Sequence, residues 1–392
     1  MNIRADFPAL AEGLAHFDGP GGTQVPEAVA AAVAATYRSA VSNGHVAFAS
    51  SRRSDAIVAQ ARQAAADLLG ADPRGVVLGQ SMTANTYVLA GALAKTWQPG
   101  DEVVVSRLDH DANVRPWVQA AARAGATVRW AEIDPETCEL PLEQYDDLLT
   151  DRTRLVAVTV ASNATGTRPD VRGIAEKAHA AGALVHLDGV HATPHGPVDA
   201  FALGADLYAC SAYKWYGPHL GVTVADPALL ETLHPDKLLP SSDEVPDRFE
   251  LGTTAFAQCA ALTATVDWLA SLGSGATRRE QLLDAMAQLA AHEEQVFTRL
   301  LSGLQDRDDV QLLGLPGPFD ATRRTPTVAF RMAGESPGAT AARLGEQGIA
   351  VWSGHYYAIE LMTALGLPDG AVRAGVVGYT SDDDVDRLLA AL

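Results

Sequence analysis

Two stretches of the chain, LVHLDGVHATPH (184–195) and ADLYACSAYKWYGP (205–218), decide the fold and position its chemistry. In each stretch a short apolar run ends in polar side chains, Asp188 in the first and Ser211 and Lys214 in the second. Such runs, separated by lengths suited to crossover connections, are typical of an open, mostly parallel α/β sheet, and these sheets carry their sites at the carboxyl ends of the strands. The polar residues directly after each strand are therefore the candidate functional residues.

Outward from these stretches, β-branched runs alternate with Ala-rich amphipathic stretches, which is the pattern of strand and crossover helix. The predicted strands are Val76–Leu78, Glu102–Ser106, Thr127–Trp130, Leu155–Val160, Leu184–Leu187, Leu207–Cys210 and Val222–Val224. The predicted helices between them are Ala84–Lys95, Val114–Ala124, Val171–Ala181 and Pro197–Leu203.

Past Gly252 the pattern changes to that of an α+β domain. Long helical patterns at Phe256–Leu272 and Arg278–Leu304 precede short apolar runs at Thr327–Phe330, Ile349–Val351 and Val372–Val376 and a last helix at Asp382–Leu392. The polar segment Pro235–Arg248 is predicted to be a long loop before this second domain.

Composition limits the class of protein. The 392 residues are 47% hydrophobic and carry a net charge of −19, which repels nucleic-acid phosphates and anionic lipids, so neither is expected as a partner. No apolar stretch approaches the roughly 18 to 20 residues of a membrane-spanning helix, and the start lacks the pattern of a signal peptide, so we expect a cytoplasmic protein. Cys138, Cys210 and Cys259 are an odd number without paired spacing, which indicates neither a disulfide framework nor a zinc site.

Asp188 and Lys214 are the pair with the most specific chemistry. A carboxylate at the end of an apolar strand is costly to bury unless it meets a cation or a strong donor. A lysine flanked by Tyr213 and Trp215 is placed where desolvation lowers its pKa and makes it a nucleophilic amine. Singly, Asp188 also fits a turn and Lys214 a surface lysine. Together they are the two groups that pyridoxal phosphate needs from its protein: an acid for the ring nitrogen and an amine that forms an imine.

The stretch VVLGQSMTANTYVLAGALAK (76–95) is a candidate phosphate site. It predicts a strand, a Gly-Gln-Ser turn and a helix beginning near Thr83, so free amides and the positive end of the helix dipole face an anion. Thr83 and Ser211 can add hydroxyl groups, although the stretch alone also fits an ordinary capped helix. The chain has no GxxxxGK[ST] motif, and its Gly-rich piece Asp18–Thr23 does not follow a strand, which disfavours nucleotide cofactors.

Polar residues also follow two further strands. In the stretch DEVVVSRLDHDANVRPW (101–117), His110 and Asn113 lie just beyond the predicted strand. In VTVASNATGT (158–167), Asn163 follows the next predicted strand. An imidazole can lie flat on a cofactor ring and an amide can donate to a ring hydroxyl, although each residue alone is typical of a polar turn. Their place at successive strand ends favours one shared site.

Nine motifs spread over almost the whole chain resemble one family. They are FDGPGGTQVP, SRRSDA, SMTANT, RLDHDANVRPW, SNATGT, LDGVHATPHG, CSAYKWYGPH, ELGTT and VRAGVVGYT. Together they resemble the class V branch of the fold-type I pyridoxal-phosphate enzymes, and within it the cysteine desulfurase-like proteins, relatives of selenocysteine lyase and isopenicillin N epimerase. The resemblance implies a large cofactor-binding domain over 16–255 with a mostly parallel seven-stranded sheet, and a smaller α+β domain over 256–392 joined by residues 1–15.

The resemblance also implies roles for individual residues. Lys214 carries the cofactor, Asp188 pairs with its pyridinium nitrogen, and His110 stacks on its ring. The other implied cofactor-binding residues are Asn163 and His191 near the phenolic oxygen, Ser81, Met82, Thr83, Ser211 and Tyr213 towards the phosphate, and Thr253, which reaches the phosphate of a second subunit. A homodimer with shared sites follows from the last of these.

For the amino acid substrate, the resemblance implies that Arg373 clamps the carboxylate. Three residues of the stretch 352–357, namely His355, Tyr356 and Tyr357, together with Trp352 either line a pocket for an aromatic or extended side chain, supply an acid to the leaving group, or pack the domain interface. Arg52 is either a second anion contact or part of a surface salt bridge.

One departure limits how far the activity carries over. The mobile loop of the desulfurases reads RTGHHC and ends in the cysteine that forms a persulfide, whereas the matching stretch here, WSGHYY (352–357), has no cysteine. The resemblance therefore implies a lyase that cleaves a carbon–sulfur bond by β-elimination without an enzyme persulfide. An epimerase or aminotransferase acting on a specialised amino acid, and a non-catalytic scaffold, are the alternatives; retention of Lys214 and Asp188 argues against the scaffold.

Overall fold

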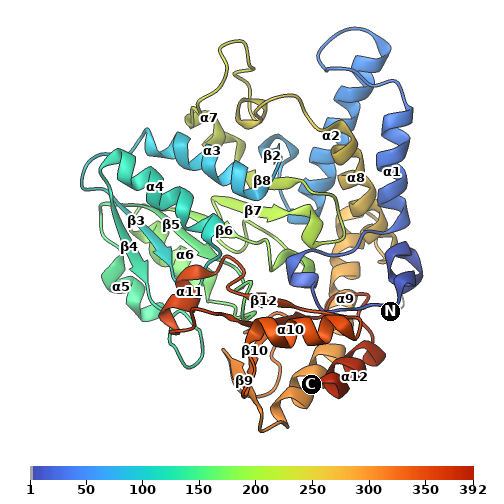
Figure 1. The fold of residues 1–392 in the computed structure, drawn as a ribbon. Helices are drawn as coiled ribbons and strands as arrows, with labels where there is room; N and C mark the ends of the chain where they lie inside the picture. The colour runs from blue at the N-terminus through green and yellow to red at the C-terminus, as the bar shows by residue number, and fades with distance from the viewer. Residues whose placement is uncertain (1–2) are drawn as a thin grey trace.

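The computed structural model describes residues 3–392, and a seven-stranded sheet forms the centre of its larger part (Figure 1). The strand order is β2 (Val76–Gly79), β8 (Gly221–Ala225), β7 (Leu207–Ser211), β6 (Leu184–Asp188), β5 (Thr153–Thr159), β3 (Glu102–Ser106) and β4 (Thr127–Ala131). Only β8 runs antiparallel to its neighbours in this sheet. The predicted α/β fold is confirmed, and each of the seven predicted strands ends within two residues of its predicted limits.

The sheet forms because alternate residues of its strands meet apolar partners on both faces. Val103 and Val105 of β3 pack in one cluster with Leu89 of α3 (Met82–Ala94) and Trp117 of α4 (Arg115–Ala124). Val104 between them belongs to the cluster on the other face. That second cluster includes residues of α2 (Ala49–Leu69) and α6 (Val171–Ala180).

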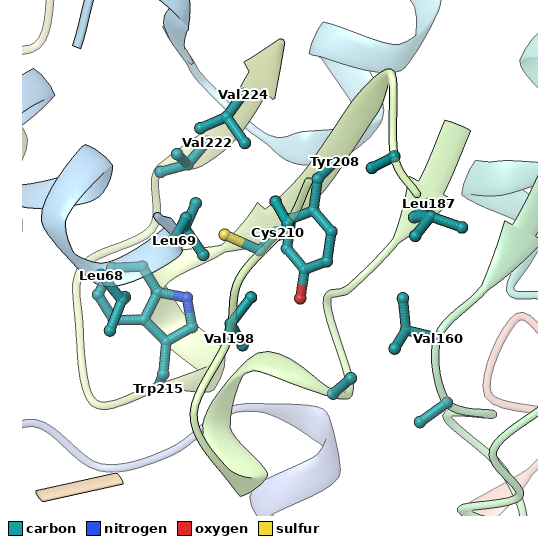
Figure 2. Packing of buried hydrophobic residues seen from close by; sticks show 14 of the residues in the cluster. Leu68, Leu69, Val160, Leu187, Val198, Tyr208, Cys210, Trp215, Val222 and Val224 are labelled. Atoms are coloured by element: carbon teal, nitrogen blue, oxygen red, sulfur yellow. The ribbon is translucent and has the colours of Figure 1, made fainter. Parts of the chain in front are cut away.

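Figure 2 shows part of this second cluster, where strand residues meet the end of α2. The Cys210 sulfur points from β7 towards Leu69, and the Tyr208 ring extends from the same strand into the cluster. Cys210 is fully buried there, as are Cys138 and Cys259 elsewhere, and all three are free thiols.

Three of the four predicted crossover helices are present as α3, α4 and α6, but the helix predicted at Pro197–Leu203 is wrong. That segment forms turns between Gly196 (φ 147°) and Gly204 (φ 86°). The Ala200 amide donates to the carbonyl of Leu69 at 3.0 Å, which ties the segment to the end of α2, and the Leu203 amide closes a single turn on the carbonyl of Asp199 at 3.3 Å. The positive φ of Gly196 and Gly204 bends the chain at both ends of this segment.

The C-terminal part holds a four-stranded antiparallel sheet in the order β12 (Trp352–Gly354), β13 (Ala371–Gly375), β10 (Thr327–Met332) and β9 (Val310–Leu313). The helices of this region are α9 (Arg278–Gln305), α10 (Pro337–Glu346), α11 (Ile359–Ala364) and α12 (Asp382–Ala391). A short pair, β1 (Ala15–His16) with β11 (Ile349–Ala350), ties the N-terminal segment to this part. In Figure 1 the red C-terminal elements lie beside the green and teal sheet.

A helical layer flanks both parts. Helix α8 (Phe256–Ser271) packs against α1 (Glu27–Arg38) and α2, which run alongside it in Figure 1. The remaining short helices are α5 (Tyr145–Leu148) and α7 (Pro227–Thr232), and the predicted loop follows α7 as an extended excursion. Among the helices of residues 3–392 we find none with the length and apolar character to cross a bilayer.

Candidate active site

Asp188 and Lys214 meet at the carboxyl ends of two neighbouring strands. Asp188 is the last residue of β6, and Lys214 ends the short 3-10 turn that follows β7. Both line a cavity of about 50 Å³ with Thr159, His191 and Ser211. The sheet register places them together because β6 and β7 are adjacent and parallel.

Burial shifts the acidity of both groups towards neutrality. Burial raises the pKa of the Asp188 carboxyl to about 6. Two smaller effects oppose this rise: the hydrogen bond that Oδ1 accepts from the Val190 amide at 2.9 Å, and the charge of Lys214. Burial and then the charge of Arg373 lower the pKa of Lys214 to about 7. At neutral pH a large fraction of the Lys214 amine is therefore uncharged and nucleophilic.

The Lys214 amine is held by the Gly-rich turn near the N-terminus. Its Nζ donates to the carbonyl of Pro20 and lies 5.2 Å from the centre of the Tyr213 ring. The Thr23 amide in turn donates to the carbonyl of Tyr213 at 2.9 Å. The Gly-rich turn Asp18–Thr23 thus forms one wall of the site. The sequence indicated it only as a possible nucleotide motif and as part of the family resemblance.

His110 stands over the same cavity as a neutral imidazole. Its Nδ1 accepts from the Ala112 amide at 3.0 Å, so a proton on the neutral ring is carried by Nε2. Burial, followed by the charges of Lys214 and Arg373, lowers the pKa of His110 to about 4. A neutral flat ring is suited to stacking on an aromatic cofactor.

Helix α3 points its N-terminus at the cavity. Ser81 caps the helix by accepting from the Ala84 amide at 3.1 Å, while Met82 and Thr83 line the cavity itself. The free amides of this first turn are available to an anion. Asn113, by contrast, is fully buried and donates to Asp109 at 2.6 Å, away from the cavity lining.

Asn163, His191 and Arg373 close the site from the side of the C-terminal part. The Arg373 Nη1 donates to the backbone carbonyl of Asn163 at 2.6 Å, and His191 Nε2 lies 3.0 Å from the Thr327 hydroxyl. Burial, and next the neighbouring His195, hold the pKa of His191 well below its ordinary value. Burial lowers the pKa of Arg373 to about 10, so it stays charged.

Two buried polar atoms here have no hydrogen-bond partner within residues 3–392. They are Oδ1 of Asn163 and Nε of Arg373. Buried polar atoms are almost always paired, so an unpaired acceptor and an unpaired charged donor beside one cavity indicate a place for a ligand. Arg373 offers its donor to a carboxylate or another anion.

A larger cavity of about 540 Å³ opens outward from this floor. His110, Asn163, Lys214 and Arg373 line it together with residues that sequence reasoning did not predict: Gly21, Tyr87, Asp111 and Arg115. Tyr87 was within reach of prediction, because it lies four positions after Thr83 and so on the same face of helix α3. Tyr356 and Tyr357, which were predicted, line this cavity as well.

Three predicted residues lie elsewhere. Thr253 lines a separate cavity of about 330 Å³ with His45 and Arg62. Arg52 is exposed and donates to the carbonyl of Ala47. His355 is exposed and accepts from the Tyr357 amide at 3.1 Å, outside the lining of the Lys214 cavity. Within a single chain, therefore, these three residues lie outside the lining of the Lys214 site.

A buried acid, a low-pKa amine, a neutral imidazole and a helix N-terminus at the edge of an α/β sheet are the groups that pyridoxal phosphate requires, and the unpaired polar atoms fit a ligand there. Fold and site together define a fold-type I pyridoxal-phosphate-dependent enzyme. The chain belongs to the class-V aminotransferase family, whose model matches residues 15–388. The predicted cofactor and family are thereby confirmed.

Individual relatives agree with this assignment. The chain is 36% identical over 407 residues to a probable cysteine desulfurase of Pseudomonas aeruginosa, covering 99% of this chain and 96% of that protein. It is 33% identical over 403 residues to an aminotransferase-like protein of Gibberella zeae, covering 100% and 97%. A crystal structure of a cysteine desulfurase from Escherichia coli superposes with a TM-score of 0.86 at 29% identity, covering 99% and 96%.

Proposed function

We propose that this enzyme is a lyase that removes a sulfur-bearing or similar substituent from the β-carbon of an amino acid without an enzyme persulfide. The supporting observation is a Lys214 site lined by His110, Asn163 and Arg373 with no cysteine in the loop 352–357. Burial raises the pKa of Cys138, Cys210 and Cys259 to about 12 each. Because thiolates and not thiols are the nucleophiles, none of the three is suited to carry sulfur.

Pyridoxal phosphate, when bound, supplies a sink for the negative charge that develops at the α-carbon. The chain's own groups do the rest. The Arg373 guanidinium, with its unpaired Nε, binds and orients the substrate carboxylate. The Lys214 amine at the floor of the cavity would take the α-proton on Nζ, for which a pKa near 7 is well matched. The Asp188 carboxylate holds a proton on the cofactor's ring nitrogen.

Epimerisation and transamination begin with the same proton transfer to Lys214, so product analysis decides between the three reactions. The holoenzyme is incubated with L-cysteine, L-cystine and S-substituted cysteines, and pyruvate, ammonia and sulfur products are measured, with Lys214→Ala as the inactive control. Absence of pyruvate with every sulfur amino acid refutes the lyase. Exchange of the α-proton with deuterium without loss of substrate indicates an epimerase, and amino transfer to an added keto acid indicates an aminotransferase.

We further propose that the enzyme is a cytoplasmic homodimer in which Thr253 completes the phosphate site of the partner. Support comes from the exposed residues Gly252 and Thr253, which lie outside the lining of their own chain's Lys214 cavity, and from exposed apolar side chains at Phe48, Leu239 and Leu251. Mixing inactive Lys214→Ala with a Thr253→Ala variant of impaired activity tests it. Mixed dimers contain one intact site, so activity rises on mixing; unchanged activity, or a monomer by light scattering, refutes the shared site.

A further inference from the structure

The loop that stands in place of the cysteine loop has an unusual backbone. Tyr356 and Tyr357 follow each other in the left-handed region, with φ of 52° and 60°. Side chains other than glycine adopt this region rarely, and two in succession persist only where the surroundings hold them there. Such strain is commonly found where a side chain must be aimed at a ligand.

Contacts from the large sheet region hold both residues. The Asn163 side chain donates from Nδ2 to the carbonyl of Tyr356 at 2.9 Å, and the Asp111 amide donates to the carbonyl of Tyr357 at 2.8 Å. The Tyr356 hydroxyl donates to the carbonyl of Ala371, and the Arg373 guanidinium lies 4.4 Å from the centre of the Tyr356 ring. Tyr356 therefore fixes the loop, and the loop fixes the direction of Tyr357.

Tyr357 is held against the site and yet remains open to it. Its ring stacks on His110 with centroids 5.4 Å apart and an interplanar angle of 27°. It is nevertheless 68% exposed, and two other exposed aromatic residues, Trp352 at 53% and Tyr87 at 39%, line the same cavity. Large aromatic side chains that stay exposed around one cavity gain from covering by an apolar ligand.

The charges at the mouth of the cavity are paired within the chain, and Glu360 accepts from Arg107 at 2.9 Å as well as from Arg115. Arg115 donates to Asp111 at 2.8 Å and to Glu360 at 3.0 Å, so its guanidinium is occupied by two carboxylates of this chain. The charged groups left for a ligand, Lys214 and Arg373, lie where the amine and carboxylate of an amino acid would be bound. The outer part of the cavity is thus aromatic and offers no unpaired charge for a charged side chain.

We propose that Tyr357, together with Trp352 and Tyr87, forms the subsite for the substrate side chain, and that the substrate class is an amino acid with a flat apolar substituent on its β-carbon, such as an S-aryl or S-benzyl cysteine. This inference rests on the proposed lyase function. A cavity of about 540 Å³ is in the range that accommodates drug-sized ligands, and the small thiol of cysteine would leave the three aromatic rings uncovered.

The test compares S-benzyl-L-cysteine with S-methyl-L-cysteine as substrates of the holoenzyme. The wild type is expected to have the higher kcat/KM with S-benzyl-L-cysteine. Tyr357→Ala should lose about tenfold in kcat/KM for this substrate, equivalent to about 1.4 kcal/mol, and change less than about twofold with S-methyl-L-cysteine. Alanine keeps a Cβ at this left-handed position, so the backbone strain is retained.

Two matched variants separate ring contact from other roles. Tyr357→Phe keeps the ring and should retain the preference, whereas Phe201→Ala removes a partly exposed aromatic side chain outside the cavity and should change neither substrate. A wild type that prefers S-methyl-L-cysteine overturns the proposal. Equal losses with both substrates in Tyr357→Ala overturn it as well, because a loop that serves only to support the fold would act on both.

A binding measurement distinguishes failure of this inference from failure of the lyase proposal. L-Homophenylalanine and L-alanine have no leaving group at the β-carbon, and their dissociation constants are obtained by calorimetry with the holoenzyme. Tighter binding of L-homophenylalanine that weakens in Tyr357→Ala supports the subsite even if no pyruvate forms from any substrate. Pyruvate formation with equal binding of the two analogues refutes the subsite and leaves the lyase standing.

Discussion

Replacing Lys214 with methionine should make the cofactor-free protein more stable, although it removes the nucleophilic amine. The structure lowers the pKa of Lys214 from 10.5 to about 7, mainly by burial and then by the charge of Arg373, with Asp188 opposing. Between pH 7 and 10.5 the unfolded chain binds a proton here that the folded chain does not, so stability rises with pH across this window. Below pH 7 the folded protein carries the buried charge at its full cost.

The size of the effect follows from the same shift. Protonation linkage gives a cost of about 4 kcal/mol at pH 7 and about 2 kcal/mol at pH 9 for retaining Lys214. Methionine has a similar length and no charge, but the hydrogen bond from Nζ to Pro20 is lost, which offsets roughly 1 kcal/mol. We therefore expect a net gain in the free energy of unfolding of about 3 kcal/mol at pH 7 and about 1 kcal/mol at pH 9.

Urea unfolding of both proteins, stripped of cofactor, measures this at the two pH values. Lys95→Met is the control, since the Lys95 amine is exposed and pairs with Asp236 at 2.7 Å, and its replacement should cost no more than about 1 kcal/mol at either pH. A Lys214→Met variant that is no more stable than the wild type at pH 7 refutes the reasoning. So does a gain that fails to shrink between pH 7 and pH 9.

Three further results are expected. Asp188→Asn keeps the shape of the buried acid and removes its charge, so kcat should fall about a hundredfold, while the absorption spectrum still shows bound cofactor; a change below fivefold would contradict the assigned role. Gly21→Ala places a Cβ against Nε1 of the exposed Trp352 indole and so displaces this ring of the subsite; KM for S-benzyl-L-cysteine should therefore rise with little change in the melting temperature. A large loss of stability would show that the indole cannot move. Iodoacetamide should leave the activity and the intact mass of the native enzyme unchanged, because the three thiols are buried with pKa values near 12. Rapid alkylation with loss of activity would indicate that one of these cysteines can form a persulfide.

The central part of the site was predictable because its residues follow strands directly. Asp188 ends a buried strand and Lys214 follows the next strand by one short turn, and the apolar runs themselves show where both strands end. Adjacent parallel strands then bring these ends to one edge of the sheet. The helix predicted at Pro197–Leu203 was wrong because an amphipathic pattern reports only local sequence. The hydrogen bond from the Ala200 amide to Leu69 joins residues far apart in the chain, and no local pattern shows it.

The outer wall of the site was not predictable in the same way. Gly21 and Arg115 lie far apart in the chain and on different elements, and no spacing between them carries information. The roles of Thr253 and Arg52 stay predictions: that of Thr253 depends on a second subunit, and Arg52 lies outside the lining of the Lys214 cavity.

The sequence by itself determined the sheet, the chemistry at its edge and the missing cysteine, because strand patterning and the polar residues after each strand are local properties of the chain. Only the tertiary structure decided that two strained tyrosines turn the replacement loop into a fixed aromatic wall. The physical reason is that hydrogen bonds from Asn163 and Asp111 hold this conformation, and both residues lie roughly two hundred positions or more earlier in the chain. These hydrogen bonds form only once the two parts of the molecule have packed together.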